Sequence, residues 1–137
     1  MSETTTRNAL LSALIGGTDY PIAFENSHPP FDPEPHELWL AQYYLPTSGD
    51  SRGKGSNSSQ ERGIYQVSIF IKASLTDYDN TMLQAKDEIK AIFSEGTILS
   101  DVGGDVLLYN NTSTGGSIQN GWFKTDLSFN FATYQTI

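Results

Sequence analysis

Two histidines and an aspartate form the first arrangement in the chain that could do chemistry. His28, Asp32 and His36 follow one another at intervals of four residues. Two imidazoles and one carboxylate are ligands that suit a transition metal. Four prolines occur between residues 26 and 37, and they exclude the helix on which this spacing would align the three side chains. The pattern favours solvated loop histidines over a metal site.

The glycine-rich stretch Gly49 to Gly55 is the second candidate, because it has a faint likeness to a phosphate-binding loop. Three residues separate Gly49 from Gly53 where that motif has four, and Gly55 stands where Ser or Thr would hold magnesium. The next expected element is a strand, so no helix N-terminus follows to bind the anion. The sequence therefore indicates no nucleotide site and no cofactor.

Other catalytic signatures are missing from the sequence. The chain has no cysteine, which excludes disulfides, thiolate metal sites and cysteine nucleophiles. No G-x-S-x-G elbow occurs, and no pair of carboxylates is marked by its spacing for acid and base catalysis. We expect a protein that is not an enzyme.

The charge balance bears on possible partners. There are 16 acidic and 8 basic residues, and the formal net charge is −8. A free-standing nucleic-acid binder normally carries a basic patch, so this balance argues against one. The acids either serve solubility alone or form a surface that DNA passes without sticking. With no signal-peptide pattern and no apolar run near the roughly 20 residues of a membrane span, we expect a cytoplasmic origin and no membrane partner.

A polar segment over residues 47–60 is rich in Ser and Gly and contains no apolar residue. Its composition predicts a flexible loop, which we place at about residues 47–62 when its basic flank is included. Arg52, Lys54 and Arg62 put three of the eight bases within eleven residues. The segment is either a solvated loop or an arm that orders on an acidic partner.

Consecutive tyrosines precede this segment. Tyr43 and Tyr44 lie in an expected strand, so their side chains point to opposite faces and one of them cannot reach the core. An exposed tyrosine suits a protein interface, although single exposed aromatic residues are also normal. The candidate interface residues are therefore Tyr43, Tyr44, Arg52, Lys54 and Arg62.

Hydrophobic periodicity predicts the elements that must position these residues. Apolar side chains at intervals of three and four predict helices over residues 6–15 and 79–94, and alternation predicts long strands over 64–72 and 122–133. Shorter strands are expected over 20–25, 38–45, 97–99 and 105–109. Gly16-Gly17 is expected to end the first helix, and residues 110–116 to form a polar turn. This order predicts an α+β fold in one domain over residues 1–137, with a mostly antiparallel sheet packed against two helices.

A succession of short motifs resembles the phage tail terminators of long-tailed phages, the minor tail protein U type. It begins with the run from Pro21 to Asn26 and Phe31 with Pro33, and continues with the strand over 38–45 and the Gly/Ser-rich loop. The run from Arg62 to Val67 and a helix that ends Ile92-Phe93-Ser94-Glu95-Gly96 complete it. The resemblance covers about residues 20–99 and departs from the family over 72–79, where no Pro- and Gly-bearing turn occurs.

This resemblance implies a structural virion protein at the head-proximal end of the tail. The family forms a ring, usually a hexamer, that binds the tail tube protein, stops tube growth and offers a surface to the head–tail connector protein. Genomic DNA would pass through the lumen without specific binding, past an acidic wall, and the basic loop would reach the acidic face of a neighbouring subunit. The alternative is another tail or neck component, either a tube protein or a head-completion protein.

Overall fold

The computed structural model of the chain describes residues 3–24, 32–33, 35–51, 59–73, 78–101 and 104–134. Two helices and seven strands follow one another in this part of the chain: α1 (Glu3–Gly17), β1 (Ile22–Ala23), β2 (Leu38–Ser51), β3 (Ser59–Lys72), α2 (Tyr78–Ile92), β4 (Ile98–Asp101), β5 (Gly104–Ser113), β6 (Ser117–Gln119) and β7 (Trp122–Tyr134).

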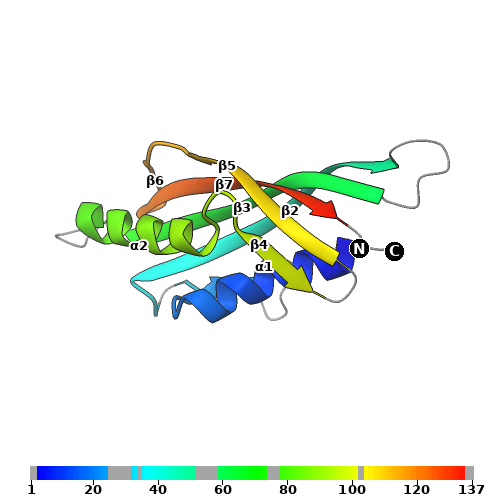
Figure 1. Cartoon of the computed structure of the whole chain (residues 1–137). Coiled ribbons are helices and arrows are strands. Elements are labelled where there is room, and N and C mark those ends of the chain that lie inside the picture. Colours follow the sequence, from blue (N-terminus) through cyan, green and yellow to red (C-terminus); the bar gives the residue numbers. More distant parts are fainter. Residues whose placement is uncertain are drawn as a thin grey trace.

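All seven strands belong to one sheet. Their order is β1-β2-β3-β7-β5-β4, and β6 pairs with β7 outside this path. Every pair is antiparallel except β1 with β2, which is parallel and two residues long. Figure 1 shows the curled sheet with α1 and α2 on the same side of it. The α+β class that the sequence predicts, with its mainly antiparallel sheet and two helices, is confirmed.

The central strands β3 and β7 alternate strictly between the two faces of the sheet. Their pairing is continuous from Arg62 opposite Ala132 to Lys72 opposite Trp122. On the face toward the helices, Tyr65 lies opposite Phe129 and Val67 opposite Leu127, and all four side chains are fully buried. The period-two pattern over 64–72 and 122–133 therefore predicts both strands and their buried face correctly.

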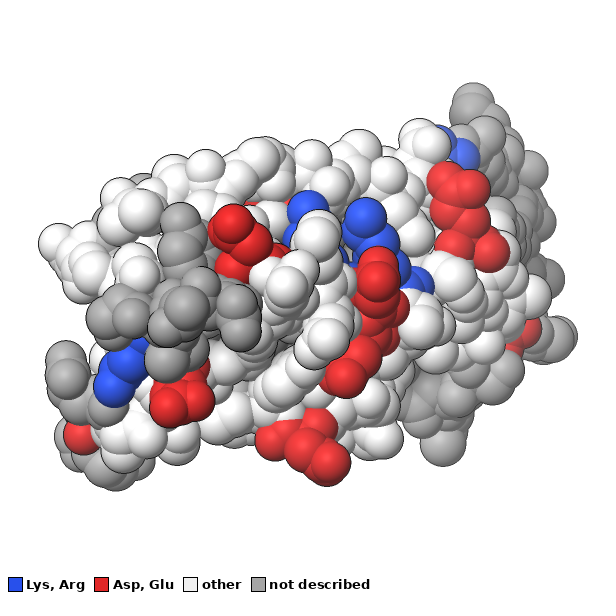
Figure 2. All heavy atoms as spheres, turned by 90° about the vertical axis from the view of Figure 1, so that its left-hand side faces the viewer, with Lys and Arg blue, Asp and Glu red and all other residues white. Residues whose placement is uncertain are grey.

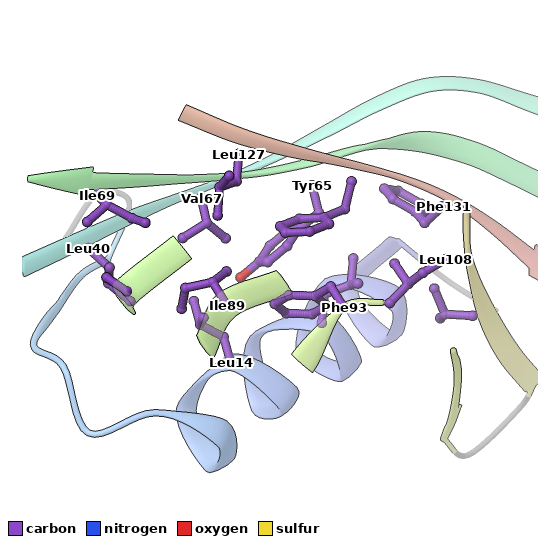
Figure 3. Packing of buried hydrophobic residues seen from close by; sticks show 14 of the residues in the cluster. Leu14, Leu40, Tyr65, Val67, Ile69, Ile89, Phe93, Leu108, Leu127 and Phe131 are labelled. Carbon is purple, nitrogen blue, oxygen red and sulfur yellow. The ribbon is translucent and has the colours of Figure 1, made fainter. Parts of the chain in front are cut away.

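One hydrophobic core lies between the sheet and the helices. Helix α1 contributes Leu10 and Leu14, and α2 contributes Ile89 with Phe93 just beyond its end, all fully buried. Figure 3 shows Tyr65 between the sheet and Phe93, and the two rings are 5.5 Å apart between centroids. Aromatic pairs at this distance add about 0.5–1.5 kcal/mol to the burial of their area. The spacing of apolar residues in the sequence thus identifies the side that each helix buries against the sheet.

The β2–β3 hairpin is longer than its composition predicts. Strand β2 continues to Ser51 and β3 begins at Ser59, so much of the expected loop over 47–60 is paired strand. Pairing of backbone groups does not require apolar side chains, which explains why a polar segment extends the ladder. Residues 52–58 lie outside the described part of the chain.

Two asparagines allow the sheet to continue where the sequence predicts a turn. Asn110 has a φ of 56°, and the register of β5 on β7 shifts between Tyr109 and Asn111. This is a β-bulge, which lets β5 run on to Ser113 through the predicted turn at 110–116. Asn120 and Gly121 also have positive φ and connect β6 to β7 in a two-residue turn.

Helix α1 ends at Gly17, so the glycine pair ends the helix as predicted, two residues beyond the expected last residue Ile15. A Cβ on Gly17 would lie 2.6 Å from side-chain carbons of Ile92, whereas a Cβ on Gly16 would meet nothing within 4 Å. Gly17 thus permits close approach of α1 to the end of α2. Strand β1 covers only two of the six residues predicted for it.

The expected histidine loop is described only in part. His28 lies outside the described residues. His36 is half-buried, and its backbone N–H donates to the carbonyl of Pro33 at 3.0 Å. Within the described ranges, no group of three His, Cys, Asp or Glu side chains is placed to hold a metal ion.

Gly63 gives a test of the β2–β3–β7 packing. A Cβ there would lie 2.7 Å from the backbone oxygen of Leu45 and 2.6 Å from the ring of Phe131. Because a backbone oxygen cannot rotate away, Gly63→Ala is expected to lower the free energy of unfolding by about 1–3 kcal/mol. Gly16→Ala, which enters open space on a helix, is the control and is expected to raise it by up to about 1 kcal/mol. Equal effects of the two changes in urea unfolding would contradict this packing.

Tyr20 connects the end of α1 to α2. Burial, and then the charge of Glu88 and a hydrogen bond to it, raise the pKa of Tyr20 above its ordinary value of 10.0. The unfolded chain therefore releases this proton first, so the stability that neutral Tyr20 contributes is present below about pH 10 and is lost as the pH rises through the folded pKa. We expect the difference in melting temperature between the wild type and Tyr20→Phe to shrink above pH 10. A constant difference from pH 8 to 11 would contradict the link.

Candidate subunit interface

The sheet face that points away from the helices is named the outer face here. It receives alternate side chains of β2, β3 and β7. The register places Trp39 opposite Phe70 and Phe70 opposite Lys124, while Tyr43 lies opposite Gln66 further along the ladder. No helix within the described ranges packs on this face (Figure 1).

Three aromatic rings from three strands gather at one end of the outer face. Trp39 stacks on Phe70 with 4.0 Å between centroids and 4° between planes, and Trp122 meets Trp39 edge to face at 5.9 Å. All three side chains are half-buried. Aromatic residues of this kind are enriched at protein interfaces, because they present large apolar area with few rotatable bonds.

A polar cluster sits beside these rings. The Ser68 hydroxyl donates to Asp126 Oδ1 at 2.6 Å, and Lys124 Nζ lies 3.7 Å from the same oxygen. Lys124 Nζ is also 5.6 Å from the centroid of Phe70, within reach of a cation–π contact. Ser68 is fully buried, although it is on the outer face, because the larger neighbours cover it. The polar cluster thus contacts the aromatic group through Lys124, which lies near both Asp126 and the ring of Phe70.

Tyr43 and Leu45 are the exposed apolar residues of β2 on the outer face. Their relative exposures are 37% and 44%, and Ala41 between Trp39 and Tyr43 is nearly buried. Strand β2 is also open on its far edge beyond Ala41, since β1 pairs only with Leu40 and Ala41 among the described residues. An apolar, partly open strand edge is a surface that proteins usually cover.

The five residues predicted for an interface are not all brought together. Tyr43 and Arg62 are exposed and lie on the outer face. Tyr44 lies on the opposite face, half-buried, with its ring stacked on Phe131 at 5.4 Å between centroids. Arg52 and Lys54 lie outside the described residues.

A shallow groove lies at the edge of the helix layer, between α2, β6 and β7. Its volume is about 260 Å³, and it is lined by Asp79, Met82, Leu83, Lys86, Gly116, Phe123 and Thr125. The lining is mainly apolar, and its single acid and single base, Asp79 and Lys86, are seven residues apart on α2, which is about 10 Å along the helix. The groove suits an apolar side chain better than a reacting substrate.

Acidic and basic side chains are mixed on the end of the molecule where α2 begins. Figure 2 shows this end, with red and blue groups interspersed and separated by uncharged surface. A patch of one sign, as nucleic-acid binding needs, is not visible on this face. No helix within the described ranges is both long and apolar enough to cross a membrane.

Sequence reasoning missed the aromatic group as a candidate site. The available signal was Phe70, an apolar ring in the otherwise polar half of the β3 alternation that also contains Gln66, Ser68 and Lys72. Its partners could not be read from the sequence, because they depend on the register of β2 and β7 on β3.

Comparisons with known proteins point to one family. A family model described as "Phage tail terminator protein" matches residues 5–131, which is most of the chain. A solved structure is similar over 100% of this chain and 98% of its own, with a TM-score of 0.74 and 20% sequence identity. At that identity, the likeness between the two structures concerns the fold alone. No curated protein matches the chain significantly.

The Ser68–Asp126 hydrogen bond provides a test of the outer face. A hydrogen bond to a charged group contributes about 1.5–3 kcal/mol, so Ser68→Ala is expected to destabilise the fold by about that amount. In a double-mutant cycle with Asp126→Ala, the two losses are expected to be less than additive by about 1 kcal/mol or more. Strict additivity in chemical unfolding would show that the two side chains do not interact.

Proposed function

The chain belongs to the phage tail terminator family, and from this premise we propose that it caps the tail tube as a ring. In this role it ends tube polymerisation and provides the surface on which the head joins the tail. Membership of the family makes it a structural protein of the phage tail. The observation that carries the proposal is the extent of the family match, which runs from α1 into β7 and therefore spans the whole fold.

The proposed partners are copies of the chain itself, the tail tube protein and the head–tail connector protein. A hexamer is the stoichiometry usual in the family, and the head-proximal end of the tail is the location that the role requires. One domain over residues 1–137 would supply all three contacts. A non-catalytic role agrees with a groove whose one acid and one base, Asp79 and Lys86, stand about two helical turns apart on α2.

The candidate interface residues fit a ring contact in a specific way. Tyr43 and Arg62 are exposed on the outer face, where a neighbouring subunit can reach them. We assign Arg52 and Lys54, which lie between β2 and β3 in the sequence and outside the described residues, to the same contact. Tyr44 would act indirectly, since its stacking on Phe131 holds the backbone of β2 beneath Tyr43.

The charge of the chain suits the passage of DNA. A net charge of −8 in each subunit, repeated around a ring, repels the phosphate backbone. At physiological salt this repulsion extends about 8–10 Å from the charged surface. DNA would then pass through the lumen without specific binding.

Tail length in a phage that lacks this gene tests the proposed function. Without the protein, electron microscopy is expected to show tubes of irregular, extended length and heads that are not joined to tails. Addition of the purified protein to tubes during assembly is expected to restore one length and the joining of heads.

Two other results would favour different tail or neck components. If the purified protein polymerises into long tubes, it is a tube protein. If tails of normal length accumulate without the gene while filled heads remain incomplete, it is a head-completion protein. Either result would contradict the terminator role.

A further inference from the structure

We propose that Asn120 is a site of spontaneous deamidation, in which the backbone nitrogen of Gly121 attacks its side-chain amide. The two residues form the turn between β6 and β7. Asparagine is a thermolabile residue, and a following glycine, which has no Cβ, hinders the attacking nitrogen least. The reaction needs only water and does not depend on the proposed ring.

The reaction has two steps and involves no oxidation or reduction. The Gly121 nitrogen gives up its proton and bonds to Cγ of Asn120, the bond from Cγ to Nδ2 breaks, and ammonia leaves. Water then opens the resulting five-membered imide at either carbonyl, which gives aspartate or isoaspartate. Each product adds one carboxylate to a chain whose formal net charge is −8.

The surroundings of the turn leave room for this ring closure. Asn120 and Gly121 are both exposed, so the side-chain amide can rotate and water reaches it. A Cβ placed on Gly121 would meet no atom within 4 Å, so no neighbour blocks the approach of the two reacting atoms. Among the described residues, no backbone partner accepts a hydrogen bond from the N–H of Gly121.

Few contacts hold the turn closed. Strand β6 pairs with β7 through Ser117, Ile118 and Gln119 only. Outside this ladder, the described backbone contact of the turn is one hydrogen bond, in which Ala73 N–H donates to the Gly121 carbonyl at 3.0 Å. A short hairpin of this kind opens at a lower free energy than the whole fold, so the turn can adopt the backbone angles that the attack requires.

Asn110 shows why the fold selects Asn120. The two asparagines share a positive φ, 56° and 52°, and both are exposed. The residue after Asn110 is Asn111, which carries a Cβ and is paired opposite Phe129 on β7. Its nitrogen is therefore more hindered and belongs to a longer ladder than the nitrogen of Gly121.

Isoaspartate changes the hairpin more than aspartate does. Its main chain runs through the side-chain carbon, so one atom is added between the paired residues Gln119 and Trp122. Because the turn sets the register of a hairpin, this addition disrupts the pairing of β6 with β7. The ring of Phe123 occupies the space where a Cβ on Gly116 would lie, so release of this segment uncovers that ring.

Peptide mapping of aged protein tests the proposal. The purified wild-type chain is incubated in mildly alkaline buffer at a temperature where circular dichroism shows it folded, and a second sample is incubated unfolded in urea. Mass spectrometry follows amide loss at each asparagine, and chromatography separates peptides with aspartate from those with isoaspartate. Asn110 is the control within the same molecule, since it matches Asn120 in residue type, exposure and sign of φ.

In the folded sample, Asn120 is expected to lose its amide and give both aspartate and isoaspartate, while Asn110 keeps its amide. The proposal is overturned if Asn120 stays intact in the folded protein, whether or not it reacts in urea. Equal loss at Asn110 and Asn120 also overturns it, because the fold then selects no site. Aspartate as the sole product would exclude attack by Gly121.

Hydrogen exchange tests the effect on the hairpin. The isoaspartate form is purified and compared with Asn120→Asp, a variant with the same added charge and an unchanged main chain. The amides of β6 are expected to exchange faster in the isoaspartate form than in the variant, while those of β3 stay protected in both. Equal protection of β6 in the two proteins would contradict the loss of pairing.

Discussion

The antiparallel pairing of β3 with β7 is the constraint on which the rest of the molecule depends. Eleven consecutive residue pairs fix which side chains enter the core and which lie on the outer face. A slip of one residue would replace Tyr65, Val67 and Leu127 with polar neighbours on the face toward the helices. The helices would then lose the apolar surface on which they pack. The slip would also break the buried cluster of Tyr65, Phe93 and Phe129, whose ring centroids are 5.5 and 5.0 Å apart in the observed register.

The same register gives the molecule two unlike sides. On one side it presents apolar residues that α1 and α2 cover. On the outer face it aligns Trp39, Phe70 and Trp122 from three strands. The hydrogen bond from Ser68 to Asp126 lies beside these rings. Within the described residues, helices cover one side of the sheet and none covers the other, so that side is open to partners. That property fits a family whose members act in phage tails.

The sequence predicted the parts of this fold whose periodicity is strong. Strand β7 and helix α2 were predicted to within two residues at each end, because burial on one face imposes a pattern on each. The apolar half of β3 was predicted as well, but its polar start from Ser59 to Gly63 was not. The bulge at Asn110 and the turn at Asn120-Gly121 were missed, although Asn-Gly is a strong hairpin signal. The sequence also indicated that one of Tyr43 and Tyr44 must be exposed. Which one depends on the register of β2 on β3, a long-range property that no local pattern contains.

A reconstruction of the head–tail junction by electron cryomicroscopy tests whether this chain is the terminator. The proposed function predicts one ring of this chain between the last ring of tube protein and the connector, with DNA passing through its lumen. A structure that places this fold in every ring along the tube, or in the head and away from the tail, would contradict it.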